Sequence, residues 1–385
     1  MPSQSWLGLF FDLAFVASIV VVSNSYSADY SAEQTLWLVG VFALIWTTWL
    51  MTTLRMAASP VTRTWPGVLI VAQMALVLLM AITANDFVED TTESVGALFG
   101  LILVTAILLN RTLTEDDDPT RLGRSELVRM IAAIVLFAAT WWTPDSGIIY
   151  VMLWLLGVAL ALSTIHAQKQ SDPQLRHAIG HRFGEFTIIV LGESFLKIAL
   201  VASEEPLEEV DLFALPLVFC VIAALWWLYF AHIAPLGVPQ RHPRTWIMVH
   251  LPLHMFIVGL AVGLSKLLLP DADAYFGSGF ALITVPLVLA LLCIGVLIRL
   301  GGGPYARRGL RALLLGVVGV LAVVALNYLG RGLEFDLAGT VLLIAIVLAA
   351  VIRSIGPYSP RDDGTRPSRE SDADRADRSD TAPVG

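Results

Sequence analysis

Apolar residues fall into long runs along almost the whole chain, separated by short polar stretches. A run of about 17 to 24 apolar residues is long enough for an α-helix to cross a bilayer. Such runs lie at roughly 7–23, 36–54, 66–84, 94–110, 127–143, 147–165, 184–201, 211–231, 246–268, 275–298, 309–329 and 336–353. They lack the period-two alternation of strands, and open sheet edges cannot exist in lipid. The pattern therefore predicts an all-α, polytopic helical membrane protein with about 12 transmembrane helices.

A polar segment follows the last apolar run. Residues 357–385 contain seven acidic residues and five arginines among Ser, Pro and Gly, with almost no apolar side chain to bury. Such a composition does not support a folded core. We therefore expect a twelve-helix transmembrane domain over 1–356 and a disordered tail over 357–385.

Composition narrows the classes of protein further. The chain is 57% hydrophobic and 15% charged, whereas soluble globular proteins carry roughly 25% charged residues. A soluble enzyme, a nucleic-acid-binding protein and a disordered scaffold are therefore excluded, and we expect no enzymatic activity. The two cysteines, Cys220 and Cys293, both lie inside apolar runs, which argues against a disulfide framework and a thiolate zinc site. Walker, HExxH and GxSxG motifs are absent from the sequence, so no cofactor is predicted.

Basic residues are concentrated in alternate loops between the predicted helices. They are Arg55, Arg63, Arg111, Arg121, Arg124, Lys169, Arg176, Arg182, Arg241, Arg244, Arg299, Arg307, Arg308, Arg311 and Arg353. The intervening loops have Arg331 as their one basic residue and carry acidic residues instead, such as Asp86, Glu89, Glu204 and Glu208. Because loops rich in Lys and Arg stay in the cytoplasm, the alternation predicts that both termini, and with them the tail, are cytoplasmic.

The two halves of the chain resemble each other weakly. Trp65, Val68, Met74, Val77 and Leu79 recur 181 residues later as Trp246, Val249, Met255, Val258 and Leu260. Six predicted helices per half is an even number, so the halves 1–168 and 169–356 would have the same orientation. Parallel repeats of this kind occur in many secondary transporters, whose sites lie between the halves. The alternative is chance, since apolar helices share residue types often.

Ionisable residues inside the apolar runs are the main candidates for function, because each costs about 2.5–3.5 kcal/mol at the bilayer centre. Glu193 lies near the middle of the run 184–201, and Lys197 follows four residues later on the same helix face. Glu185 shares that broad face. Two interpretations stay open: a proton, cation or substrate site in the bundle interior, or a buried Glu–Lys pair that only fixes packing. The small residues Gly192 and Ser194 would let another helix approach closely.

Three further polar residues interrupt apolar runs. Asp12 lies five residues into the first run, where a bond to an interfacial arginine such as Arg182 would satisfy its charge. His250 and His254 lie four residues apart on either side of Pro252. That spacing can hold a metal, but no third ligand is evident in the sequence, so no metal site is predicted. The histidines either line a polar site or are satisfied within the core.

The sequence from 182 to 194, RFGEFTIIVLGES, resembles the signature of the bacterial low temperature requirement A proteins. FFDLAFV at 10–16, WWLYF at 226–230 and HLPL at 250–253 resemble other blocks of that family, in the same order. The resemblance extends over about 5–355. It implies a multi-pass protein of the bacterial cytoplasmic (inner) membrane, of undefined molecular activity.

The resemblance also marks individual residues. Asp12, Arg182, Glu185 and Glu193 match motif positions of the family. Three other positions depart from the family pattern, which commonly has acidic residues there. They hold Gly8, His181 and Ala231 in this chain.

Three hypotheses follow from these residues. The leading one is a secondary transporter-like protein for an unknown small solute or ion, in which Asp12, Glu185 and Glu193 line a polar site with Arg182 and Lys197 as charge partners. The two histidines described above would line the same site.

The rival is a non-transporting membrane sensor or scaffold whose buried charges are structural. An intramembrane enzyme is weaker, because acid–base residues at an interfacial loop are limited to His177, His181 and Arg182. The lipid bilayer is the expected partner, nucleic acid is not, and a homo-oligomer is compatible with the sequence.

Overall fold

The computed structural model describes residues 6–28, 32–59, 61, 63–85, 92–114, 121–142, 148–164, 172–204, 206, 212, 214–268, 272–329 and 337–356. Within these residues the secondary structure is helical. The α-helices are α1 (Trp6–Ala28), α2 (Ala32–Ala58), α3 (Thr64–Asn85), α4 (Thr92–Leu113), α5 (Arg124–Ala139), α6 (Ile148–Ser163), α7 (Pro173–Glu204), α8 (Ala214–His232), α9 (Pro243–Ser265), α10 (Ala272–Gly301), α11 (Gly303–Leu329) and α12 (Leu337–Ile355). Short 3-10 turns, η1 (Thr140–Trp142) and η3 (Lys266–Leu268), extend α5 and α9.

Each helix coincides with one of the predicted apolar runs, so the all-α prediction is confirmed for the described residues. Nine of these helices are long and apolar enough to cross a membrane. Among the remaining three, α6 and α12 are shorter apolar helices. Many large apolar side chains also face outward, for example Leu315 at 72% exposure and Val318 at 62%. An apolar outer surface suits lipid rather than water. The chain is therefore a multi-pass membrane protein, while the count of twelve spans stays a prediction.

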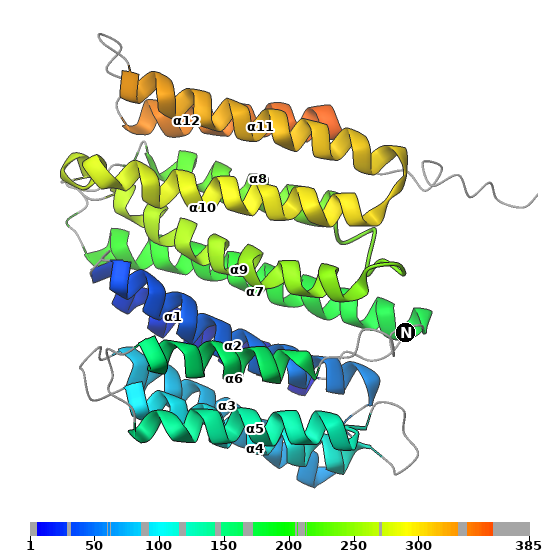
Figure 1. Cartoon of the computed structure of the whole chain (residues 1–385). Coiled ribbons are helices and arrows are strands. Elements are labelled where there is room, and N and C mark those ends of the chain that lie inside the picture. Colours follow the sequence, from blue (N-terminus) through cyan, green and yellow to red (C-terminus); the bar gives the residue numbers. More distant parts are fainter. Residues whose placement is uncertain are drawn as a thin grey trace, which may run out of the picture.

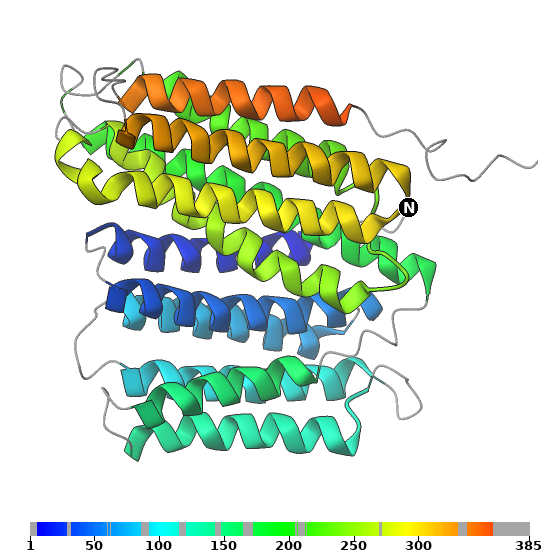
Figure 2. The same cartoon turned by 45° about the horizontal axis from the view of Figure 1, so that its top comes forward.

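The helices form two groups that lie side by side (Figures 1 and 2). The first group is α1–α6 and the second is α7–α12. They meet where α1 and α2 contact α7 and α9. Several of the largest buried side chains gather at this boundary, among them Trp46 and Trp49 from α2 with Phe183 and Phe186 from α7. Trp49 stacks on Phe186 with 4.1 Å between ring centroids. The boundary between the groups is therefore closed by aromatic packing.

Helix contacts inside the first group recur inside the second, six helices later in the chain. The pairs α1 and α3, α3 and α4, α4 and α5, α5 and α6, and α1 and α2 are all in contact. Their counterparts in the second group are also in contact, namely α7 and α9, α9 and α10, α10 and α11, α11 and α12, and α7 and α8. The order in which helices pack is therefore the same in both groups.

Helix α7 begins earlier than its apolar run predicted. Its first residue is Pro173 rather than 184, because the first turns carry polar residues that the hydropathy pattern does not count. Asp172 starts the helix: its carboxylate accepts a hydrogen bond from the Gln174 N–H at 2.9 Å, and its carbonyl accepts one from the Arg176 N–H. Proline suits the first helical position. Consequently Arg182 lies within a helix rather than in a loop.

The close helix approach expected at Gly192 is wrong. Gly192 is exposed, and a Cβ there would meet nothing within 4 Å. Ser194 is buried, as a packed position should be. The close approach instead occurs at Gly263 in α9, where an added Cβ would lie 2.5 Å from the backbone oxygen of Leu282 in α10. The predicted tail, 357–385, lies outside the described residues.

Candidate functional site

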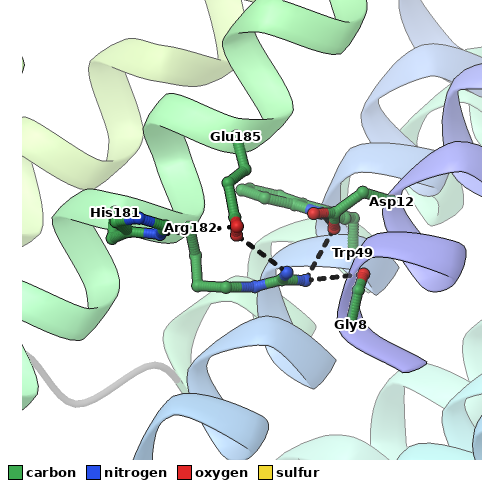
Figure 3. A network of polar contacts seen from close by, with 6 residues as sticks. All are labelled: Gly8, Asp12, Trp49, His181, Arg182 and Glu185. Atoms are coloured by element: carbon green, nitrogen blue, oxygen red, sulfur yellow. Dashed lines mark hydrogen bonds and ion pairs between the residues drawn. The ribbon is translucent and has the colours of Figure 1, made fainter. Parts of the chain in front are cut away.

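Arg182 joins α7 to α1 through a buried charge cluster (Figure 3). Its Nη2 donates hydrogen bonds to Asp12 Oδ1 at 2.7 Å and to the Gly8 carbonyl at 3.2 Å. Its Nη1 donates to Glu185 Oε2 at 3.0 Å. Trp49 in α2 donates its indole N–H to the same Asp12 oxygen at 2.8 Å. The predicted bond between Arg182 and Asp12 is therefore present, while the second oxygen, Asp12 Oδ2, is buried and has no hydrogen-bond partner among the described residues.

The Asp12 carboxylate depends on these partners for its charge. Asp12 is fully buried, and the Arg182 side chain is 14% exposed. Loss of one partner of a buried ion pair typically costs about 3–5 kcal/mol, because the other charge is left without compensation. Glu185 is slightly exposed and also faces His181, at 3.5 Å between Oε1 and Nδ1. We call Gly8, Asp12, Trp49, Arg182 and Glu185 the arginine cluster.

Two positions that depart from the family pattern lie at this cluster. The backbone of Gly8 supplies a carbonyl acceptor to Arg182, and His181 faces Glu185 with half of its side chain exposed. Where the family commonly has two further acids, this chain therefore offers one neutral acceptor and one imidazole.

Glu193 belongs to a second cluster, further along the same two helices. Its Oε1 accepts a hydrogen bond from Ser23 of α1 at 3.4 Å. Lys197 donates to the same Ser23 hydroxyl at 3.3 Å and to Asn24 Oδ1 at 2.8 Å. Both Glu193 and Lys197 are 3% exposed. We call Ser23, Asn24, Glu193 and Lys197 the glutamate cluster.

The expected direct pair between Glu193 and Lys197 does not form. Ser23 lies between the two side chains and contacts both. The other carboxylate oxygen, Glu193 Oε2, is buried and has no hydrogen-bond partner among the described residues. Glu193 is therefore a buried carboxylate that keeps an acceptor atom not used by the surrounding protein.

The two clusters lie at different levels of one helix pair. The side-chain hydrogen bonds between α1 and α7 in the described residues join positions 170 to 174 apart, so the two helices run parallel in a constant register. Asp12 and Ser23 are eleven residues apart, which is roughly 16 Å along a helix. Phe15, Ile19 and Phe186, all buried, occupy the levels between them. The structure thus divides the predicted site residues between two clusters rather than gathering them in one site.

His250 and His254 lie in the aromatic core between α2, α7, α8 and α9, and every ring nitrogen has a protein partner. The Trp46 indole N–H donates to His254 Nδ1 at 3.1 Å, so the proton of a neutral His254 is on Nε2, which faces Thr187 Oγ1 at 2.9 Å. His250 Nδ1 lies 2.8 Å from the Trp246 carbonyl, which requires a proton there. Its Nε2 then accepts from the Tyr229 hydroxyl at 3.0 Å. The arrangement matches two neutral imidazoles with opposite tautomers.

These contacts leave the histidines no free nitrogen for a ligand. Among the described residues, no group of three or more His, Cys, Asp or Glu side chains is placed to hold a metal. The histidines therefore support the aromatic core of the boundary, and they reach the arginine cluster only through packing. Trp49, which contacts Asp12, lies edge-on to His254 with 6.5 Å between ring centroids.

Several residues of the two clusters were not predicted from the sequence. Ser23, Asn24 and Trp49 bind the charged side chains, and Thr187 binds His254. None of these residues is ionisable, so a search for charges in apolar runs passes over them. A search for polar side chains at matching levels of α1 and α7 would have included Ser23 and Asn24, once the register of the two helices was known.

The chain is similar in sequence to one known bacterial protein family and to an uncharacterised bacterial protein. The sequence model described as bacterial low temperature requirement A protein (LtrA) matches residues 3–352. A protein of Rhizobium meliloti (strain 1021), described as uncharacterised, is 26% identical over 248 residues, which is 58% of this chain. The matched segment covers 57% of that relative, so the similarity spans little more than half of its length. No solved structure matches the chain.

Proposed function

The chain belongs to the bacterial low temperature requirement A protein family, and from this membership and the geometry above we propose that it is a secondary transporter-like membrane protein. Its polar site would be centred on Glu193. The family defines no substrate, so we infer only the chemical class of the solute. It would be a proton, a metal cation or a small cationic group that a carboxylate oxygen can bind. An enzymatic activity is not part of the proposal.

The observation that carries the proposal is the state of the Glu193 carboxylate. A carboxylate inside a membrane domain is costly, and a purely structural one is expected to be held by a cation or by short hydrogen bonds. Glu193 Oε1 receives one long hydrogen bond from Ser23, and Oε2 receives none from the described residues. The nearest cation on the same helix face, Lys197, bonds to α1 instead. A group that is buried but not satisfied suits a site that binds a ligand in another step of its cycle.

The arrangement of the helices also supports a transporter-like architecture. The same helix pairs pack in both groups, as two parallel halves 1–168 and 169–356 would require. In addition, Asp12 and Glu185 are related by the sequence offset of 173, and the contacts between α1 and α7 fall at 170 to 174. Contacts between equivalent positions are expected when a pseudo-twofold axis runs between two helices. The proposed site then lies at the boundary of the halves, in the cytoplasmic membrane, with both termini in the cytoplasm.

A ligand screen by thermal unfolding tests the proposal. Purified full-length protein is heated with inorganic cations, amino acids and nucleosides, in parallel with E193Q and with E126Q as a matched control. Glu126 is a buried glutamate of α5, far in sequence from the proposed site. A ligand at 100 times its Kd stabilises the folded state by about 2.7 kcal/mol. We expect a compound that stabilises wild type and E126Q but not E193Q.

Uptake into proteoliposomes then separates transport from binding. The stabilising compound should accumulate with wild type and E126Q and not with E193Q. An E193Q protein that folds normally and retains full uptake would contradict the proposal. If no compound stabilises the wild type, the scaffold function is favoured instead.

The second candidate, a non-transporting sensor or scaffold, is favoured by the arginine cluster. The 2.7 Å contact between Arg182 and Asp12 joins α7 to α1, and the Trp49 hydrogen bond joins α2 to the same aspartate. Such contacts suit a structural role, because they hold the three helices together. Asp12 also keeps one oxygen, Oδ2, without a hydrogen-bond partner among the described residues, but its Oδ1 binds both Arg182 and Trp49. Glu193 has only the long hydrogen bond from Ser23, which is why transport is the first proposal.

A further inference from the structure

A cavity of about 470 Å³ lies where α3 begins, α4 ends and the segment before α5 starts. Its walls include Arg63 and Trp65 at the start of α3, Arg111 and Thr112 in the last turn of α4, and Arg121 before α5. None of these residues belongs to the arginine cluster or the glutamate cluster. The cavity is therefore separate from the proposed transport site.

Two of the three arginines have no acceptor of their own. Arg63 and Arg111 make no hydrogen bond or ion pair with any described residue. No carboxylate of the described residues lines the cavity. Positively charged side chains around one cavity repel one another when no counter-charge is present. An anion bound between them would remove this electrostatic repulsion. The planar guanidinium group, with its parallel N–H donors, is also the side chain best matched to phosphate oxygens.

The backbone holds the cavity in a fixed shape. Asn110, which is buried, accepts the Leu122 N–H at 2.9 Å through its side-chain oxygen, and this bond fixes the segment that carries Arg121 against α4. The hydroxyls of Thr112 and Thr114 donate to α4 carbonyls at 3.0 Å and 2.6 Å, so they leave the arginines as the donors to any ligand. Trp65 and Pro66, in the first turn of α3, line the same wall, so the arginines remain the donors there.

We propose that this cavity binds a phosphate anion, either free or as the headgroup of an anionic lipid. Phosphate is the common chemistry, because it accepts bidentate hydrogen bonds from Arg63 and Arg111 together. The surroundings suit a lipid as well, since Trp65 is 59% exposed and Val68, one turn further along α3, is 49% exposed. An exposed tryptophan beside basic residues is typical of the interface between headgroups and acyl chains.

An acidic segment of the chain itself could bind the arginines in place of an external anion. Residues 115–118, with the sequence EDDD, lie between Thr114 and Arg121 in the sequence and are outside the described residues. Their carboxylates would be the alternative counter-charge for the arginines. The test must therefore distinguish an external phosphate from an internal carboxylate.

The experiment measures binding to the purified full-length protein by thermal unfolding and by native mass spectrometry. One arm adds inorganic phosphate at constant ionic strength, and the second adds phosphatidylglycerol, with phosphatidylcholine as the neutral lipid control. The variant is R63Q/R111Q. Its matched control is R307Q/R308Q, which removes the same charge from exposed positions of α11 away from the cavity. A third variant, E115Q/D116N/D117N/D118N, replaces the four carboxylates of 115–118 with neutral amides.

We expect phosphate or phosphatidylglycerol to bind the wild type and R307Q/R308Q, with affinity at least about tenfold weaker in R63Q/R111Q. Binding of inorganic phosphate identifies a free anion as sufficient, whereas binding of phosphatidylglycerol alone identifies the lipid headgroup. The proposal is overturned if neither ligand binds, or if both double variants lose affinity equally, because the attraction is then general electrostatics. It is also overturned if only the amide variant of 115–118 binds, since the carboxylates are then the resident anion.

Discussion

Asp12 and Glu193 are both buried carboxylates on the boundary between the helix groups, but their surroundings differ. Asp12 receives a short ion pair and an indole hydrogen bond, whereas Glu193 receives one long hydrogen bond from a hydroxyl. In a protein interior, a well-paired carboxylate contributes to the rigidity of the fold. A poorly paired one is available for a ligand. The two residues are therefore expected to differ in stability measurements as well as in function.

A pair of double-mutant cycles measures this difference. R182M should lower the free energy of unfolding by about 3–5 kcal/mol, because it leaves the Asp12 charge buried without a counter-charge. D12N/R182M should recover part of that loss, which gives a coupling energy above about 1 kcal/mol. E193Q and K197M should couple more weakly than D12N and R182M, since Ser23 separates the two side chains and no direct ion pair joins them. Equilibrium unfolding in detergent supplies all four free energies of each cycle.

H181Q serves as the control for these cycles, because half of the His181 side chain is exposed. Its effect on unfolding should be within about 0.5 kcal/mol of zero. Strong coupling between Glu193 and Lys197, equal to that of Asp12 and Arg182, would contradict the distinction drawn between the two clusters.

The sequence predicted a residue contact correctly where few side chains could supply the required charge. A buried aspartate needs a cation, and Arg182 was a cation at the right level of the membrane, so that pair could be named. The partners of Lys197 could not be named. Serine and asparagine are common near helix ends, and the contact with Ser23 and Asn24 depends on how α1 and α7 are aligned in space.

At the scale of elements, Gly263 marks a close approach between the backbones of α9 and α10. A Cβ at this position would lie 2.5 Å from the Leu282 oxygen and 2.8 Å from its carbonyl carbon. Backbone atoms of a packed helix cannot move aside as a flexible side chain can. G263A should therefore force α9 and α10 apart and destabilise the protein by about 1–3 kcal/mol.

G192A is the matched control for this substitution. Gly192 is also within a helix, but an added Cβ meets nothing within 4 Å. Replacement by alanine at such a site stabilises a helix by up to about 1 kcal/mol. Thermal unfolding of both variants should therefore show shifts of opposite sign, and a G263A protein as stable as the wild type would contradict the close contact.

The positions of the helices followed closely from hydropathy, because lipid exposure requires long apolar runs. The start of α7 did not, since its first turns are polar and are stabilised by Asp172 and Pro173 rather than by burial. Close packing was also not predictable from residue size: Gly192 and Gly263 are both glycines inside apolar runs, but only Gly263 of the two faces a neighbouring helix.

At the scale of the whole molecule, the charge pattern predicts how the protein lies in the membrane. Consecutive helices run back and forth across the molecule (Figure 1), so the starts of α3 and α5 and the end of α4 lie at one end. Arg63, Arg111 and Arg121 meet there in one cavity, as the alternation of basic loops requires. The cytoplasmic side was assigned from the sequence and is open to a direct test.

Reporter fusions test this orientation. Green fluorescent protein fused after residue 385 should fluoresce, and alkaline phosphatase fused there should be inactive, because the positive-inside bias predicts a cytoplasmic C-terminus. Fusions inserted in the acidic segment 205–211 should give the opposite pair of results. Active phosphatase at residue 385 would reverse the assignment of both ends.

The layer between the two clusters has a consequence for protons. Ser18 and Thr187 are the hydroxyls of α1 and α7 at the intervening levels, and each donates its proton to a carbonyl of its own helix, at 3.0 Å to Ala14 and 2.7 Å to Phe183. Neither continues a chain from Asp12 toward Glu193, and the neighbouring side chains Phe15, Ile19 and Phe186 carry no exchangeable hydrogen. Proton hopping requires a continuous relay of donors and acceptors. The described side chains of α1 and α7 therefore form no continuous hydrogen-bonded relay from Asp12 to Glu193, so the two carboxyl groups are expected to exchange protons with their own surroundings rather than with each other.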